Sequence, residues 1–343
     1  MKAKVLVTGG NGFLAMHIIK QLLDDAYPVR ATVRSIEKQT NVITALQNAN
    51  TANLDQLSFI EASLTEDANW PTAMKDITYV MSVAAPVFVN GTNDPQTVTQ
   101  TATQGTLRIL KAAVNANVKR VIMTSNLGAV GFSNLDATHV TTEVDWTDSE
   151  QPGLSLYEKS KLVAEKSAWE YLKRTDSKLE FVTVNPGAML GPALDQHVSG
   201  SFGLVKNLLD GTFSRIPRIE MNIVDVRDVA DMHVRAMMTP QAAGKRFLAV
   251  NDVPVSMGGI ATVIRLNRPE LAAKVPTKLL SGWLIKLASH FNQQAKEGRL
   301  FLEINHNVSN QQAKSVLGWH PIYSNEQTIL SAVDQLVKSG EIK

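Results

Sequence analysis

Tyr157 and Lys161 are the two residues whose types and spacing could do chemistry together. On a helix, residues four apart lie on one face. A tyrosine alone is a poor proton carrier because its pKa is about 10, and a nearby ammonium lowers that pKa. The pair could then exchange a proton with a carbonyl oxygen while hydride reaches the carbonyl carbon. Of the five tyrosines, only this one has a lysine at i+4. A surface helix with a solvated lysine is the alternative interpretation.

The stretch 4–17, KVLVTGGNGFLAMH, predicts a strand, a glycine turn and a helix in succession. Its apolar start is typical of a strand buried on both faces, and a helical pattern begins at Phe13. Gly9 would allow a tight turn. Gly12 lacks a Cβ, so a pyrophosphate could approach the N–H groups at the helix start. With Ala15 as the third small residue, this order predicts a dinucleotide-binding βαβ unit; an ordinary glycine turn is the alternative.

Arg34 follows the second expected strand, residues 28–33, and Lys38 lies one turn further on. In a βαβ unit this strand end lies beside the adenosine ribose. An acid there would accept hydrogen bonds from both ribose hydroxyls and repel a 2′-phosphate, whereas an arginine would bind that phosphate. No acid precedes Glu37, so the sequence favours NADP(H) over NAD(H). The alternative is that Arg34 is a solvated cation at a strand end.

Strand and helix patterns then alternate along the chain. The expected strands are 57–62, 79–84, 118–124 and 181–184, and the expected helices are 95–117 and 162–172. Alternation predicts a parallel sheet covered on both faces, with the ligand at the carboxyl ends of the strands. The residues expected at such ends include Thr8, Arg34, Ala84, Ser125 and Pro186.

The fold class predicted is therefore α/β, a Rossmann-type doubly wound parallel sheet with a smaller, mostly helical C-terminal substrate lobe. Residues 1–190 and roughly 219–251 are assigned to the dinucleotide-binding domain, with a further strand at 219–224 returning to the sheet and another at 245–251. Residues 191–218 and 252–343 are assigned to the substrate lobe. Candidates for its apolar pocket wall, each of which could instead be ordinary core, are Phe88, Met189, Phe202, Trp283 and Phe291.

The composition of the chain argues against several classes of function. The 343 residues include 34 basic and 32 acidic ones, a balance that argues against a nucleic-acid surface. Cysteine is absent, which excludes disulfides and thiolate chemistry, and the seven histidines are too scattered to suggest a metal site. No apolar run is long enough to span a membrane, and the first strand begins too early for a signal peptide. We expect a cytoplasmic protein with no membrane partner.

Several motifs resemble the extended short-chain dehydrogenase/reductase superfamily, and within it the dihydroflavonol-reductase-like and methylglyoxal-reductase-like branch. They are the TGGNGFLA turn at 8–15, VRATVRS at 29–35, the YxxxK pair, AEKSAWEYL at 164–172, NPGAMLGP at 185–192, VDVRDVADMH at 224–233 and AKSVLGWHP at 313–321. Together they cover nearly the whole chain.

This resemblance implies an NADPH-dependent reductase whose substrate is a small-molecule aldehyde or ketone, with Tyr157 as the acid and Lys161 holding the nicotinamide ribose and lowering the tyrosine pKa. The residues that it and the βαβ pattern assign to the cofactor are Gly9, Gly12, Phe13, Leu14, Arg34, Lys38, Ser63, Leu64, Ala84, Ala85, Thr124, Tyr157, Lys161, Pro186, Ala188 and Met189.

Two positions depart from the family pattern. The family usually has Thr-Ser-Ser at the end of the fifth strand, and its second serine contacts the substrate oxygen. Here Asn126 occupies that position, with Ser125 just before it. An asparagine amide can donate to a developing oxyanion, so either residue could hold the substrate oxygen, or both could only cap the strand. Ser63 replaces an aspartate that typically contacts the adenine amino group.

Two other functions stay open on this fold. A nucleotide-sugar epimerase or dehydratase would need a polar, charge-rich pocket, and an epimerase would cause no net oxidation. A cofactor-sensing binding protein is favoured only by Asn126. A homodimer is left open as the assembly.

Overall fold

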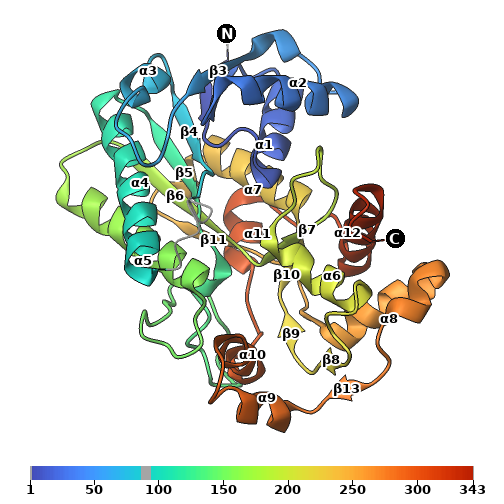
Figure 1. The fold of residues 1–343 in the computed structure, drawn as a ribbon. Coiled ribbons are helices and arrows are strands. Elements are labelled where there is room, and N and C mark those ends of the chain that lie inside the picture. Colours follow the sequence, from blue (N-terminus) through green and yellow to red (C-terminus); the bar gives the residue numbers. More distant parts are fainter. Residues whose placement is uncertain (1, 86–93, 343) are drawn as a thin grey trace.

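The structure is a computed structural model that describes residues 2–85 and 94–342. Its centre is a seven-stranded sheet in the order β11-β6-β5-β4-β1-β2-β3 (Figure 1). Every pairing within this sheet is parallel. The strands are β1 (Val5–Val7), β2 (Val29–Val33), β3 (Leu57–Glu61), β4 (Tyr79–Ser82), β5 (Arg120–Thr124), β6 (Glu180–Pro186) and β11 (Arg246–Ala249). The predicted Rossmann-type α/β fold is confirmed.

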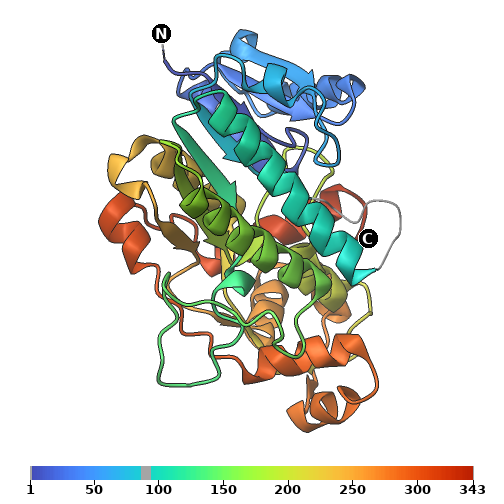
Figure 2. The same ribbon diagram turned by 90° about the vertical axis from the view of Figure 1, so that its left-hand side faces the viewer.

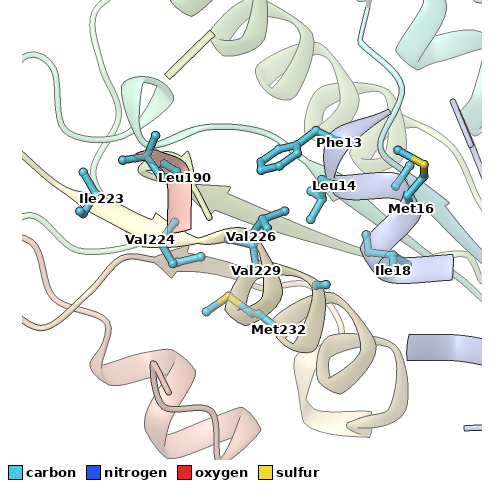
Figure 3. Packing of buried hydrophobic residues seen from close by; sticks show 14 of the residues in the cluster. Phe13, Leu14, Met16, Ile18, Leu190, Ile223, Val224, Val226, Val229 and Met232 are labelled. Atoms are coloured by element: carbon cyan, nitrogen blue, oxygen red, sulfur yellow. The ribbon is translucent and has the colours of Figure 1, made fainter. Parts of the chain in front are cut away.

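Helices cover both faces of the sheet, and side chains alternate between the two cores. Val5 and Val7 pack in one core with α1 (Phe13–Asp24) and α7 (Val226–Met238). Figure 3 shows the buried side chains of these two helices close together. Leu6 points to the opposite core, formed with α4 (Pro95–Asn115) and α5 (Leu156–Arg174). These two helices lie side by side in Figure 2. Because both faces are buried, the strands are continuously apolar.

Two shorter helices complete the first half of the chain. They are α2 (Gln39–Asn48), after the second strand, and α3 (Trp70–Met74), which packs near α4. The edge formed by the carboxyl ends of β1, β2, β4, β5 and β6 is where the predicted site residues were expected.

The C-terminal part is mostly helical, as predicted. Its helices are α6 (Gly203–Leu209), α8 (Met257–Asn267), α9 (Gly282–Ala288), α10 (Gln293–Glu303), α11 (Gln311–Leu317) and α12 (Asn325–Lys338). Three two-stranded sheets join them: β7 (Ala188–Leu190) with β10 (Ile223–Asp225), β9 (Glu220–Met221) with β12 (Val255–Ser256), and β8 (Ile216–Pro217) with β13 (Leu279–Leu280).

One strand prediction was wrong. The segment 219–224 does not return to the main sheet but is divided between β9 and β10, each paired with a local partner. The strand expected at 245–251 does join the main sheet, as β11 beside β6. The division of the chain into two domains near residue 190 stays a prediction.

Neither a membrane span nor a metal centre is visible in residues 2–85 and 94–342. None of the helices there is both long and apolar enough to cross a bilayer. Within the same ranges, no three histidine, aspartate or glutamate side chains are grouped so that they could hold a metal ion.

Candidate active site

The glycine turn after β1 has the geometry of a phosphate-binding cradle. Gly9 adopts φ +67°, a left-handed conformation, and a Cβ on it would lie 3.2 Å from the Cβ of Ala84. Gly12 caps α1 without any side-chain hydrogen bond to the first turn. The N–H groups of that turn and the positive end of the helix dipole are therefore available to an anion.

Thr8 ties this turn to the end of β4, a role that the sequence did not reveal. Its buried hydroxyl accepts hydrogen bonds from the backbone N–H groups of Val83, at 3.0 Å, and Ala84, at 2.9 Å. The contact fixes the start of the Ala84-Ala85 segment directly beside the glycine turn. Small side chains there leave space for a flat ligand at the sheet edge.

Arg34 and Lys38 lie just beyond β2, and both side chains are exposed. Neither side chain has a hydrogen-bond or ion-pair partner among the described residues, so both cations are free to bind an anion. The backbone N–H of Ala62 donates to the Val33 carbonyl at 3.0 Å, which places Ser63 beside the same strand end. The Ser63 hydroxyl is 2.8 Å from that of Thr65.

Leu64 belongs to the packing under this edge. Its Cβ would lie 2.9 Å from a Cβ on Gly105 of α4, so its side chain is held against that helix. Two further predicted cofactor residues, Phe13 and Leu14, are buried at the start of α1. Phe13 packs edge-on against Phe202, with ring centroids 5.5 Å apart. Phe13 and Leu14 belong to the core on the α1 side of the sheet, whereas Leu64 packs on the α4 side.

Tyr157 stands in the first turn of α5. A capping box starts the helix there: the Glu158 N–H donates to the Ser155 hydroxyl at 3.2 Å, and the Ser155 N–H donates to the Glu158 carboxylate at 2.8 Å. The Tyr157 side chain lines the sheet-edge pocket, and 42% of the residue's surface is exposed. Desolvation, followed by the Glu158 charge, raises the pKa of Tyr157 to about 12.

Lys161 is buried one turn after the tyrosine, and its ammonium donates to the Thr124 carbonyl at 2.9 Å. Burial lowers the pKa of Lys161 to about 8, while the charge of Glu165 acts in the opposite direction. Burial is the largest cause of the pKa shift in both Tyr157 and Lys161, and the lowering of the tyrosine pKa by Lys161 stays a prediction.

A pocket brings together five predicted site residues from three parts of the chain. They are Ala84, Ala85, Thr124, Tyr157 and Lys161. The rest of its lining comes from β4, α4, β5 and α5: Ser82, Ala102, Thr106, Met123, Ser160 and Ala164. The predicted pair thus faces the sheet edge at which the glycine turn also opens.

Ser125 and Asn126 have different environments. Ser125 is buried and its hydroxyl donates to the Glu165 carboxylate at 2.5 Å; neither Ser125 nor Asn126 is among the residues that line this pocket. Asn126 is half-buried, and its side-chain oxygen accepts from the Ala129 N–H at 3.1 Å. The Asn126 amide nitrogen has no hydrogen-bond partner among the described residues, so it is available as a donor.

Pro186, Ala188 and Met189 lie where β6 passes into β7. Pro186 is the buried last residue of β6, and the other two are half-buried in β7. A Cβ on the intervening Gly187 would lie 2.2 Å from the Asn222 carbonyl oxygen. The chain therefore passes very close to its neighbour here, and these residues border the same edge of the sheet as Thr124.

The expected apolar pocket wall is only partly assembled. Phe202 is core, packed on Phe13, rather than pocket wall. Trp283 and Phe291 lie in and after α9 with 63% and 81% of their surfaces exposed. Met189 is half-buried, and Phe88 lies outside the described residues.

Two buried groups near the pair were not among the predicted site residues. Glu165 lies four residues after Lys161, a spacing that could have signalled it. His233 is 2.8 Å from the Thr124 hydroxyl through its Nε2 atom. Its other nitrogen, Nδ1, is 2.8 Å from the Val229 carbonyl and must donate to it, so Nε2 accepts.

The open glycine cradle, the free cations beyond β2 and the Tyr157–Lys161 pair together fit a dinucleotide-binding protein of the short-chain dehydrogenase/reductase type. A family model described as the 3-beta hydroxysteroid dehydrogenase/isomerase family matches residues 6–262. The chain belongs to this family, within the extended short-chain dehydrogenases/reductases.

Named relatives and solved structures agree with the branch expected from the motifs. The chain is 32% identical over 278 residues to cinnamoyl-CoA reductase 1 of Petunia hybrida, covering 80% of this chain and 79% of the relative. It is 30% identical over 291 residues to an anthocyanidin reductase of Vitis vinifera, covering 80% and 83%. The crystal structure of yeast methylglyoxal/isovaleraldehyde reductase complexed with NADPH superimposes with a TM-score of 0.80 at 26% identity, covering 99% and 100%.

Proposed function

We propose that this protein reduces an aldehyde or ketone carbonyl to an alcohol with NADPH. The observation that supports this most directly is the pocket in which Tyr157 and Lys161 meet Ala84, Ala85 and Thr124 at the carboxyl edge of the sheet. The reductases named above, one of them solved with NADPH, support the same reaction class.

The residues present fit the cofactor at both ends. The uncapped start of α1 and the left-handed Gly9 suit a pyrophosphate, and Arg34 with Lys38 suits a 2′-phosphate. The dinucleotide, when bound, supplies the hydride. Lys161 uses one N–H for the Thr124 carbonyl, which leaves two for the nicotinamide ribose hydroxyls.

Tyr157 would supply the proton. With a pKa of about 12, the phenol is fully protonated at neutral pH and is ready to donate. An alkoxide that forms at the substrate oxygen is a much stronger base than a phenolate, so the transfer remains downhill. The raised pKa therefore suits the direction of carbonyl reduction.

Asn126 would hold the substrate oxygen. Its amide oxygen is used by the Ala129 N–H, which orients the amide nitrogen as the free donor. A fixed donor of this kind stabilises the charge that develops on the oxygen during hydride transfer. Ser125 cannot take this role while its hydroxyl donates to Glu165.

The test is a screen of aldehydes, diketones and aryl ketones with NADPH and NADH, followed by the loss of reduced-nicotinamide absorbance. We expect turnover with NADPH, and a loss of roughly a hundredfold or more in kcat for Tyr157→Phe. A Tyr157→Phe enzyme with nearly normal kcat would remove the tyrosine from the mechanism. Activity on a nucleotide sugar without net NADPH consumption would instead indicate an epimerase.

The cellular location and the assembly are part of this proposal. We expect the protein in the cytoplasm, and we expect light scattering to distinguish a monomer from a homodimer. Fractionation of cells that express the full chain would test the location.

A further inference from the structure

Glu165 is a fully buried carboxylate one turn beyond Lys161 on α5, with an exposed fraction of 0%. Five side chains donate to it. They are Ser125 at 2.5 Å, Asn185 at 2.8 Å, Arg246 at 2.8 Å, Thr183 at 3.1 Å and Trp169 at 3.3 Å. Both carboxylate oxygens accept hydrogen bonds from protein side chains, so this group holds its neighbours in place and is not a ligand-binding group.

The charge of Glu165 is balanced by Arg246 of β11. The guanidinium Nε is 2.8 Å from the carboxylate, and Nη1 donates to the carbonyls of Glu143, at 2.9 Å, and Asp145, at 2.7 Å. It also stacks 3.7 Å from the ring centroid of Trp146. A buried pair with these extra bonds is strongly disrupted when only one partner is removed.

The network reaches the substrate side through Asn185. The Asn185 amide nitrogen donates both to Glu165, at 2.8 Å, and to the backbone carbonyl of Asn126, at 3.1 Å. Asn126 is thus held at its backbone by Asn185 and at its side chain by Ala129. At the same time Glu165 holds the Ser125 hydroxyl, the other group that could have contacted a substrate oxygen.

We propose that Glu165 is a positioning residue of this site: it fixes Asn126 through Asn185 and withholds the Ser125 hydroxyl from the substrate. This inference rests on the proposed function, because it assigns Asn126 as the residue that meets the substrate oxygen. Donors of this kind act only when they are held in place, and a displacement of about 1 Å can reduce a rate roughly a hundredfold.

Glu165 also acts on Lys161. Burial lowers the pKa of Lys161, and the Glu165 charge opposes that shift. The other titratable groups around this lysine in the described part of the chain are Tyr157 on its own helix and His233 on α7, with Arg246 reached through Glu165. Loss of the Glu165 charge should therefore deprotonate Lys161 at a lower pH, which a purely structural role would not do.

The experiment compares Glu165→Gln with Glu165→Asp and with Glu170→Gln, an identical change at an exposed position of the same helix. We expect kcat of Glu165→Gln to fall about tenfold to a hundredfold, with a smaller change in KM for the carbonyl. Titration of NADPH by fluorescence should show that its binding weakens at a lower pH than in the wild type. Glu165→Asp, which keeps the charge, should retain the wild-type pH dependence even where kcat falls.

A folded Glu165→Gln protein that matches Glu170→Gln in kcat and in the pH dependence of NADPH binding would overturn the proposal, even if its thermal stability is lower. If Glu165→Gln does not fold, the double variant Glu165→Gln/Arg246→Gln, which removes both charges, is judged by the same criteria. A wild-type protein that binds NADPH but reduces no carbonyl would contradict the proposed function instead, and the NADPH titrations would still decide the effect on Lys161.

Discussion

The side-chain oxygen of Asn126 accepts the backbone N–H of Ala129 at 3.1 Å, and this contact sets which way the amide faces. The amide nitrogen is consequently the free end, at a position where the family usually has a serine hydroxyl. The neighbouring Ser125 points elsewhere, into the buried network around Glu165. The two residues that the sequence left as alternatives are therefore distinguishable by experiment.

We expect Asn126→Ala to lower kcat about a hundredfold, the typical effect of removing one oxyanion donor. Ser125→Ala removes a hydroxyl whose hydrogen is already donated to Glu165, so it should reduce kcat only severalfold, through local repacking around Glu165. Steady-state kinetics on one carbonyl substrate would compare them. The reverse order, with Ser125→Ala the more damaging change, would assign the substrate contact to the serine.

The elements around the cofactor were largely predictable because their signals are local. Val5–Val7 and the glycine turn follow one another within a few residues, and β1 and α1 form where the pattern placed them. The Tyr157–Lys161 pair was predictable for the same reason, since helical spacing alone puts both on one face. The resemblance to the superfamily then indicated the dihydroflavonol-reductase-like and methylglyoxal-reductase-like branch.

The electrostatics and the long-range contacts were not predictable in this way. The Ser125 hydroxyl donates to Glu165, which is 40 positions away in the sequence. No local sequence pattern predicts a contact of this kind. The Tyr157 pKa depends on how many protein atoms surround the phenol, and this desolvation raises it. The segment 219–224 has a strand pattern, but its partners β7 and β12 are chosen by tertiary packing.

Arg34 gives a prediction about cofactor choice. The Arg34→Asp change replaces a free, exposed cation beyond β2 with an anion that repels a 2′-phosphate. We expect the dissociation constant for NADPH to rise about tenfold to a hundredfold, because a charge-assisted contact to phosphate contributes about 1.5–3 kcal/mol. Binding of NADH should change little. Equal effects on the two cofactors would contradict the assignment, and Arg215→Asp, an exposed change in the C-terminal part, is the control.

Gly187 gives a prediction about stability. A Cβ there would lie 2.2 Å from the Asn222 carbonyl oxygen, which also accepts the Ala188 N–H at 2.8 Å. Backbone would have to move, so we expect Gly187→Ala to lower the free energy of unfolding by about 2 kcal/mol or more. Gly203→Ala is the matched control, because its Cβ would meet nothing closer than 3.8 Å. Urea denaturation would compare the two variants, and equal midpoints would show that the β6–β7 junction can move away from Asn222 at no cost in stability.

His233 gives a prediction about stability and pH. Burial lowers its pKa from 6.5 to about 4. Between these pH values the imidazole is protonated in the unfolded chain and neutral in the folded protein. The stability associated with the neutral imidazole is complete above pH 6.5 and is lost as the pH falls toward 4. This loss reaches about 2 kcal/mol at pH 5. Urea denaturation at pH 7 and pH 5 would measure it.

Other groups titrate in the same range, so the wild-type curve alone does not isolate His233. Burial also lowers the pKa of His17 to about 4, and it raises that of Asp228 to about 6, which acts in the opposite direction. The His233→Gln variant keeps both His17 and Asp228, so their contributions cancel in the comparison with the wild type. At pH 7 it should be the less stable protein, because it disturbs the contacts to Thr124 and Val229. Since glutamine does not titrate, the difference from the wild type should shrink by about 2 kcal/mol at pH 5. A difference that is the same at both pH values would show that the imidazole takes up its proton without unfolding.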